Sequence, residues 1–269
     1  MATSDTVFAG SIPDIYDRLL VPLIFEPYAR DLAERVAATK PQLVLETAAG
    51  TGAVTRALVA SIADAQIIAT DLNQPMLNHA KARQSGNARI EWKQADALAL
   101  PFEDQTFDVV VCQFGAMFFP DKVQGYREAL RVLKPGGRFF FSVWDRIEES
   151  EFADVVIQAL APVFPQDPPR FLARTPHGYC DRDRIREELN TAGFGAVSIE
   201  TVDARSKGSS ALDVAVAFCQ GTPLRNEIES RGAPSLEEAT HHAAKALTER
   251  FGAKAIDGRM RAIVMTASR

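Results

Sequence analysis

The stretch Leu43-Val-Leu-Glu-Thr-Ala-Ala-Gly-Thr-Gly-Ala-Val-Thr55 decides how the rest of the chain is interpreted. Its first three residues form a short apolar run, which is typical of a buried strand in a parallel sheet. Glu46 ends that run, Gly50-Thr-Gly52 follows, and residues 53–62 are predicted to form a helix. The glycines allow positive φ and close approach of a ligand, and the helix N-terminus offers N–H groups to an anion. This order predicts a ligand site at the carboxyl end of the strand.

The glycine spacing differs from that of two common phosphate-binding loops. A dinucleotide loop has the pattern Gly-x-Gly-x-x-Gly, and Thr55 occupies the third glycine position here. A P-loop has lysine after its last glycine, whereas Ala53 follows Gly52. Glu46 would repel a pyrophosphate but would tolerate an ammonium or a sulfonium group. A plain strand–turn–helix with no ligand is the alternative for this motif taken alone.

The motif Glu46-Thr-Ala-Ala-Gly50-Thr-Gly52 resembles the first motif of class I S-adenosylmethionine-dependent methyltransferases. The resemblance is specific over residues 40–145 and loose elsewhere. It implies an α/β, Rossmann-like fold with a seven-stranded sheet of order 3-2-1-4-5-7-6, the last strand antiparallel. Helices would cover both faces of the sheet, and a helical cap would be added. Glu46 would lie near the methionine amino group, and the backbone around Ala48 and Gly50 would contact the methionine moiety.

Two later predicted strands also end in an acid. The stretch of residues 65–72 contains the second strand, which ends at Asp71. The stretch of residues 88–97 contains the third strand, which ends at Asp96. Carboxyl ends of parallel strands meet at the ligand crevice of a doubly wound sheet. Asp71 would accept hydrogen bonds from both ribose hydroxyls, which suits NAD and S-adenosylmethionine alike. By the resemblance, Asp96 and the N–H of the next residue, Ala97, would bind the adenine edge.

The fourth predicted strand, residues 107–114, ends where the resemblance places both the methionine end of the cofactor and the methyl acceptor. Gln113 and Phe114 occupy that position. Many amine- and nucleobase-directed methyltransferases carry Asn/Asp-Pro-Pro-Tyr/Phe there, and its absence argues against nucleic-acid bases as acceptors. The apolar residues 116–119 that follow are either sheet core or the floor of an acceptor pocket.

The predicted cofactor contacts come mainly from the ends of these four strands. They are Tyr16, Glu46, Thr47, Ala48, Gly50, Thr51, Gly52, Asp71, Leu72, Met76, Asp96, Ala97, Gln113 and Phe114. By the resemblance, Leu72 and Met76 would flank the adenine, although helix core is the alternative for Met76. Tyr16 would reach the ligand from an N-terminal helical lid, or would simply pack with its hydroxyl at the surface. No catalytic base is assigned.

The pattern divides the chain into four parts. Residues 1–37 would form the helical lid, 38–145 the cofactor-binding core, and 146–180 a cap insertion. Residues 181–269 would complete the core with the sixth and seventh strands. They include a helical insertion, residues 209–257, that is either more cap or a dimer surface. Within the lid, the helix over residues 13–37 is expected to break at Pro22 and Pro27.

Composition narrows the class of partner and the compartment. A net charge of −5 gives no electrostatic reason to bind nucleic acid or an anionic membrane. The sequence has neither an apolar run of membrane-spanning length nor a signal peptide, so a cytoplasmic protein is expected. The three cysteines are far apart and show no zinc spacing, so no metal site is predicted.

Together these features predict an S-adenosylmethionine-dependent enzyme that transfers a methyl group to a small-molecule acceptor by in-line displacement, leaving S-adenosylhomocysteine. The first alternative is an NAD(P)-dependent oxidoreductase of Rossmann type, which Glu46 and Thr55 disfavour. The second is a protein that binds S-adenosylmethionine without catalysis. A homodimer is compatible with the sequence. The acceptor, and the choice among oxygen, nitrogen and carbon, are not determined by it.

Overall fold

The computed structural model describes residues 5, 10 and 12–269. Its contacts divide the chain into two compact units. We call the first the sheet unit; it comprises Tyr28–Val143, Cys180–Val202 and Ala262–Arg269. The second, the helical unit, comprises the chain up to Pro27, Trp144–Tyr179 and Asp203–Arg261.

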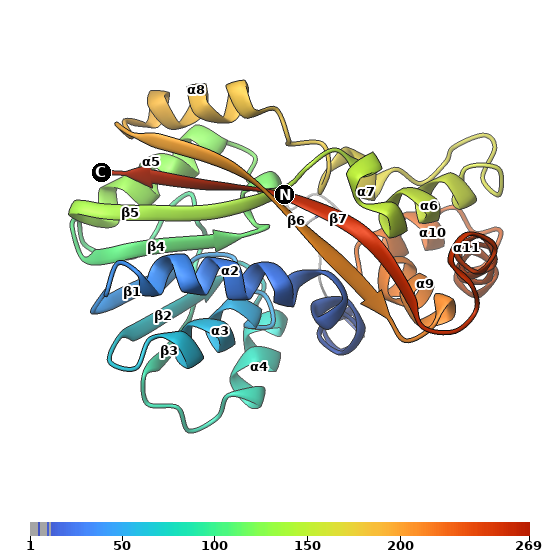
Figure 1. Ribbon diagram of the computed structural model, residues 1–269, viewed down its shortest axis with the longest axis horizontal. Helices are drawn as coiled ribbons and strands as arrows, with labels where there is room; N and C mark the ends of the chain where they lie inside the picture. The colour runs from blue at the N-terminus through green and yellow to red at the C-terminus, as the bar shows by residue number, and fades with distance from the viewer. Residues whose placement is uncertain (1–4, 6–9, 11) are drawn as a thin grey trace. The chain divides into compact units, whose positions relative to one another are not determined.

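The described part of the chain contains one sheet of seven strands in the order β3-β2-β1-β4-β5-β7-β6 (Figure 1), which confirms the predicted order. Its strands are β1 Leu43–Glu46, β2 Gln66–Asp71, β3 Ile90–Gln94, β4 Phe107–Gln113, β5 Leu133–Trp144, β6 Val197–Gly208 and β7 Ile256–Ser268. The pairs β1/β2, β1/β4, β2/β3 and β4/β5 are parallel.

The last strand runs antiparallel to β5, as predicted. Arg269 N–H donates to Gly137 O and Asp145 N–H donates to Arg261 O, so residue numbers fall along β7 as they rise along β5. Both β6 and β7 are longer than the sequence pattern predicts. β7 begins at Ile256 because Ile256 and Met260 alternate with exposed residues and continue the buried face of the strand.

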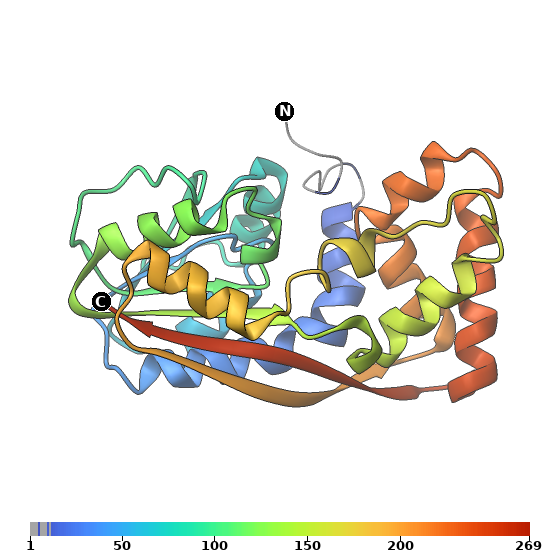
Figure 2. The ribbon, with the colours of Figure 1, turned by 90° about the horizontal axis from the view of Figure 1, so that it is seen from above.

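Alternation along the strands explains why helices cover both faces of the sheet unit. Val109, Val111 and Phe140 pack in one buried cluster with side chains of α2 (Glu26–Ala37) and α3 (Ala53–Ser61). Neighbouring residues on β5 point to the opposite face, where the Phe139 and Phe141 rings pack against Tyr126. Tyr126 belongs to α5 (Lys122–Val132), which lies beside α8 (Arg182–Ala192; Figure 2).

The predicted break at Pro22 and Pro27 is wrong, because the chain stays helical through both prolines. α1 (Ile12–Ile15) continues into a π-helix, η2 (Tyr16–Phe25), and then into α2. The proline ring clashes with the carbonyl four residues earlier in a regular α-helix, and a wider helical turn around Pro22 relieves this clash. The Glu26 N–H accordingly donates to Val21 O, five residues back.

Helices make up most of the helical unit. They are α1, η2, η4 (Ile147–Glu149), α6 (Glu151–Leu160), α7 (Phe171–Arg174), α9 (Ala211–Gln220), α10 (Leu224–Ser230) and α11 (Leu236–Phe251). α11 packs against α9 and α6, and the Phe152 and Phe251 rings meet edge to face at 5.0 Å. In sequence, α9 to α11 lie between β6 and β7, where an insertion is predicted. No helix in the described ranges has the length and apolar character needed to cross a membrane.

Candidate functional site

Glu46, the last residue of β1, is a buried acid. Its side chain is only 2% exposed, and its Oε2 accepts a hydrogen bond of 2.6 Å from Thr55 Oγ1 on α3. Burial removes the carboxylate from water and raises the pKa of Glu46 to about 8, although the Thr55 hydroxyl and the nearby Arg56 favour the charged form. A cation placed beside this group would therefore lower its pKa and gain a strong partner.

The turn between β1 and α3 depends on left-handed backbone. Ala48, Gly50 and Gly52 have φ values of 53°, 57° and 80°. A Cβ on Gly52 would lie 2.9 Å from both Gln84 Nε2 and Trp92 Cη2, so only glycine fits there. Thr51 Oγ1 is buried and makes no hydrogen bond with any described residue. Such an orphaned hydroxyl beside a helix N-terminus suits a polar ligand.

Asp71, the last residue of β2, is hydrogen-bonded to this same turn. Its Oδ2 accepts from Gly50 N–H at 2.8 Å, and its Oδ1 accepts from Asn73 N–H at 2.7 Å. Desolvation raises the pKa of Asp71, while these backbone N–H groups oppose the rise. Asn73 precedes α4 (Gln74–Arg83), but its side chain caps no helical N–H and instead donates to Asp71.

An apolar surface lies beside Asp71. Leu72 is 50% exposed, and Leu212 is the other large apolar side chain in the described ranges that is comparably open. Met76 is 3% exposed, and its Cε lies 3.7 Å from where a Cβ on Gly50 would be. Met76 is thus part of the packed interior as well as a neighbour of the glycine turn. An exposed apolar side chain next to a ribose-type acid is the arrangement expected for an adenine.

Asp96 and Ala97 lie beyond the third strand, because β3 ends at Gln94 rather than at Asp96 as predicted. Asp96 is exposed, and its Oδ1 accepts from Leu98 N–H at 2.9 Å. The Ala95 N–H donates to Asp71 O at 3.1 Å, which brings this segment to the end of β2. The structure therefore places Asp96 and Ala97 near Asp71 but on a loop.

The ends of β4 and β1 touch each other. Phe114 has a φ of 50° and is buried, and its N–H donates to Ser142 O on β5 at 2.9 Å. A Cβ on Gly115 would lie 2.4 Å from the Ala48 Cβ. Gln113 is half-buried one residue before Phe114. The two turns are in van der Waals contact, so the geometry of one constrains the other.

The structure thus brings together most of the predicted site residues within the sheet unit. They are Glu46, Thr47, Ala48, Gly50, Thr51, Gly52, Asp71, Leu72, Met76, Asp96, Ala97, Gln113 and Phe114. Tyr16 lies in the helical unit, where its ring stacks on Phe25 with centroids 5.1 Å apart. Its role at the cofactor stays a prediction. No metal-binding cluster occurs among the described residues.

Sequence reasoning missed three residues that support the glycine turn. Thr55 holds Glu46, and Gln84 and Trp92 pack against Gly52. Thr55 could have been found, because a hydroxyl at that position can reach back across one helical turn to the strand end. Gln84 is the C-cap residue of α4 and Trp92 belongs to β3, and neither carried a local signal.

Comparison with known proteins identifies the group to which this site belongs. The model of the ubiE/COQ5 methyltransferase family matches residues 7–217. A demethylmenaquinone methyltransferase of Clavibacter sepedonicus is 33% identical over 171 residues, covering 60% of this chain and 69% of that protein. The ubiquinone/menaquinone biosynthesis C-methyltransferase UbiE of Bartonella quintana is 35% identical over 168 residues, covering 58% of this chain and 65% of that protein. The chain thus spans about two thirds of the length of these two relatives.

Solved structures share the fold at lower identity. The YcgJ protein of Bacillus subtilis has a TM-score of 0.57 and 19% identity, covering 90% of this chain and 98% of that chain. The [4+2]-cyclase SpnF has a TM-score of 0.53 and 19% identity, covering 90% of this chain and 80% of that chain. These likenesses support the Rossmann-like architecture, and the comparisons give no support to the oxidoreductase alternative. On the family match, this chain belongs to the ubiE/COQ5 methyltransferase family, an S-adenosylmethionine-dependent group, as its first motif predicted.

Proposed function

We propose that this methyltransferase transfers the methyl group of S-adenosylmethionine to a ring carbon of a small quinol-type acceptor. The relatives named above act, by their names, in ubiquinone or menaquinone biosynthesis or on demethylmenaquinone. Family membership supports methyl transfer, and these names support the class of acceptor. The word C-methyltransferase in the name of the Bartonella quintana relative supports carbon as the methylated atom.

The observation that carries the cofactor assignment is the hydrogen-bonded unit of Glu46, Gly50 and Asp71. Gly50 N–H binds Asp71, and Thr55 at the start of α3 binds Glu46, so one turn holds both carboxylates at neighbouring strand ends. We assign the ligand ammonium to Glu46 and the ribose hydroxyls to Asp71. The exposed side chain of Leu72 is assigned to the adenine.

The proposed chemistry requires orientation more than acid–base assistance. S-adenosylmethionine supplies a methyl group that its sulfonium already makes electrophilic. Holding an acceptor in line with the S–CH₃ bond can lower the activation barrier by roughly 7–11 kcal/mol. A quinone ring is electron-poor, so the acceptor must be the reduced hydroquinone, whose ring carbons are nucleophilic. The carbon gains the methyl and then loses its ring proton to water or to a base that we do not assign.

Gln113 and Phe114 are assigned to the methionine end of the cofactor, next to the acceptor. The helical insertion of residues 209–257 belongs to the helical unit, and its role as more cap or as a dimer surface stays a prediction. The matched part of the chain ends at residue 217, so α10 and α11 lie outside the family model.

An activity assay with a short-chain demethylmenaquinol tests this proposal. The purified protein would be incubated anaerobically with the quinol and ¹³C-methyl-labelled S-adenosylmethionine, and the product analysed by mass spectrometry and NMR. We expect one added methylene unit and a methyl resonance of the aryl–CH₃ type. A methoxy resonance would overturn the carbon assignment. Binding of S-adenosylmethionine without turnover of quinols, phenols or amines would favour the non-catalytic alternative.

A further inference from the structure

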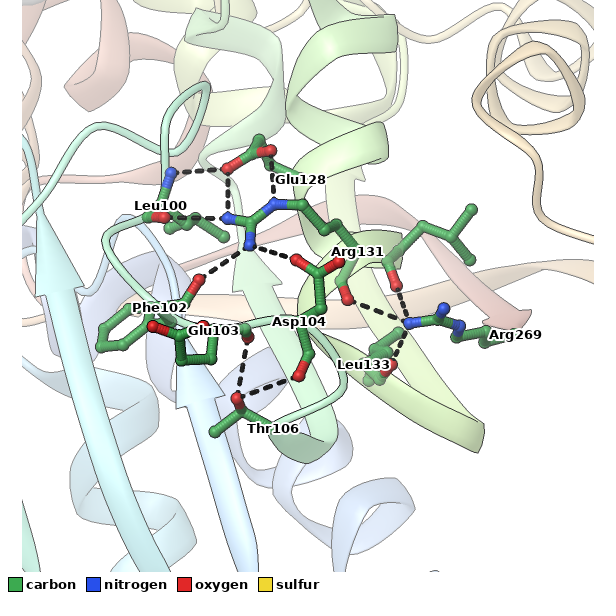
Figure 3. Close-up of polar contacts among 10 residues, drawn as sticks. Leu100, Phe102, Glu103, Asp104, Thr106, Glu128, Arg131, Leu133 and Arg269 are labelled. Carbon is green, nitrogen blue, oxygen red and sulfur yellow. Dashed lines mark hydrogen bonds and ion pairs between the residues drawn. The ribbon is translucent and has the colours of Figure 1, made fainter.

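The loop between β3 and β4 is hydrogen-bonded along one face of α5. Gln124, Glu128 and Arg131 lie four and three residues apart, so they share a face of this helix. All three bind polar groups of residues 98–104 (Figure 3 shows the Glu128 and Arg131 contacts). This loop begins directly after Asp96 and Ala97, the residues assigned to the adenine edge.

The contacts are made chiefly with backbone atoms. Gln124 Nε2 donates to Leu98 O at 3.1 Å, and Leu100 N–H donates to Glu128 Oε2 at 2.7 Å. Arg131 donates from Nη2 to Leu100 O at 2.9 Å and from Nη1 to Phe102 O at 2.7 Å. Bonds to the backbone fix the path of the loop whatever its side chains are.

Glu128 and Arg131 form a bidentate ion pair that orients both side chains. Arg131 Nε and Nη2 lie 2.9 and 2.8 Å from the two oxygens of Glu128. The Glu128 side chain is only 13% exposed, and Arg131 holds the pKa of Glu128 below its usual range. A planar guanidinium can bind a carboxylate and carbonyls at once, which lysine cannot do. Asp104 also pairs with Arg131, but its side chain is 68% exposed, so this ion pair contributes little to holding the loop.

We propose that Glu128 and Arg131 are positioning residues that set the base selectivity of the cofactor site. Asp96 Oδ1 accepts from Leu98 N–H, and Leu98 O is in turn held by Gln124. Glu128 and Arg131 hold the next part of the loop, at Leu100 and Phe102, so the position of the Asp96 carboxylate depends on where α5 holds the loop. An acid that accepts from the exocyclic amino group of adenine would reject hypoxanthine, which presents a carbonyl there. This inference rests on the proposed function, which assigns the adenine to Asp96 and Ala97.

Arg269 offers a matched control. Its Nη1 donates to Leu130 O and Arg131 O, both at 2.9 Å, and to Leu133 O. These contacts lie at the carboxyl end of α5, and none of them reaches the loop of residues 98–104 (Figure 3). Replacing Arg269 removes an arginine that binds carbonyls of the same helix without freeing the adenine segment.

The experiment compares the affinity for S-adenosylhomocysteine with that for S-inosylhomocysteine, its hypoxanthine counterpart. Calorimetry would give both dissociation constants for wild type, Arg131→Gln, Glu128→Gln and Arg269→Gln. Wild type should prefer adenine by about 10- to 100-fold, the range expected for a hydrogen bond to a charged group. Arg131→Gln should bring the ratio of the two dissociation constants to within a few-fold of one. Glu128→Gln keeps an acceptor for Leu100 N–H and should have a smaller effect.

Thermal unfolding separates positioning from plain stabilisation. Arg131→Gln and Arg269→Gln should both lower Tm, but only Arg131→Gln should change the selectivity ratio. An unchanged ratio in Arg131→Gln and Glu128→Gln, beside a selective wild type, would overturn the inference and leave the proposed function standing. If Arg131→Gln fails to fold, the ratio in Glu128→Gln decides alone. A wild type that binds neither compound would overturn both.

Discussion

At the scale of single residues, the site is defined by two buried acids, Glu46 and Asp71, whose ionisation is disfavoured by burial. Glu46 and Asp71 have the same cause for their raised pKa values, since both carboxyl groups are removed from water. Their environments differ, because Asp71 accepts from the backbone N–H groups of Gly50 and Asn73 at 2.7–2.8 Å, whereas Glu46 accepts from the hydroxyl and the backbone N–H of one residue, Thr55. Glu46 is therefore the group whose protonation a cationic ligand should change most.

Ligand binding at neutral pH should release a proton from Glu46. The pKa of Glu46 is raised to about 8, so the group is mostly protonated at pH 7, and the ligand ammonium favours the ionised form. Affinity for S-adenosylhomocysteine should rise with pH, by at most about tenfold per unit, and level off above the raised pKa. Calorimetry in buffers of different ionisation enthalpy measures the released protons.

Glu46→Gln is the control for this linkage, because glutamine keeps an acceptor for the Thr55 hydroxyl but cannot ionise. The variant should bind more weakly, with no proton release and a flatter pH profile. Equal proton release by the variant and wild type would show that another group is responsible. The folded protein should also lose stability, relative to Glu46→Gln, as pH rises from 4.5 to about 8, because ionising the buried acid is costly.

At the scale of elements, the strand ends act together because their turns touch. Ala48 follows β1 and Gly115 follows β4, and a Cβ on Gly115 would lie 2.4 Å from the Ala48 Cβ and 2.8 Å from Cys112 Sγ. Ala48 and Phe114 both have positive φ, a conformation that costs of order 1–3 kcal/mol for a residue other than glycine. Strain of this kind persists only where neighbouring packing enforces it.

Gly115→Ala should lower the free energy of unfolding by about 1–3 kcal/mol, the usual cost of overpacking. Ala48→Gly in the same chain removes one of the two clashing atoms and should recover part of that loss. Because Ala48→Gly also relieves its own positive φ, both single variants and the double variant must be measured by urea unfolding. Strict additivity of the two changes would contradict the contact between the turns.

Local patterns in the sequence were sufficient for the elements but not for all of their details. The apolar runs before Glu46 and Asp71 predicted β1 and β2, because the signal is contained in a few adjacent residues. Pro22 was misinterpreted, since a local rule treats proline as a helix breaker and cannot foresee a π-helical turn. The support of Gly52 by Trp92 depends on residues far apart in sequence, which no local pattern encodes.

At the scale of the whole molecule, the fold and the family restrict the reaction without fixing the acceptor. The sheet order is shared with proteins of different chemistry, because SpnF has the fold and is named as a [4+2]-cyclase. The family match ends at residue 217, so α10 and α11 lie beyond it.

The central claim is that acids at neighbouring strand ends bind an adenosyl amino acid, and calorimetric titration with S-adenosylhomocysteine tests it most directly. Wild type should give a single-site isotherm with this compound and no heat with NAD. Asp71→Asn should weaken binding by about 10- to 100-fold, because the ribose hydroxyls lose a charged acceptor. The absence of any heat from folded wild-type protein, or equal affinity in Asp71→Asn, would contradict the account.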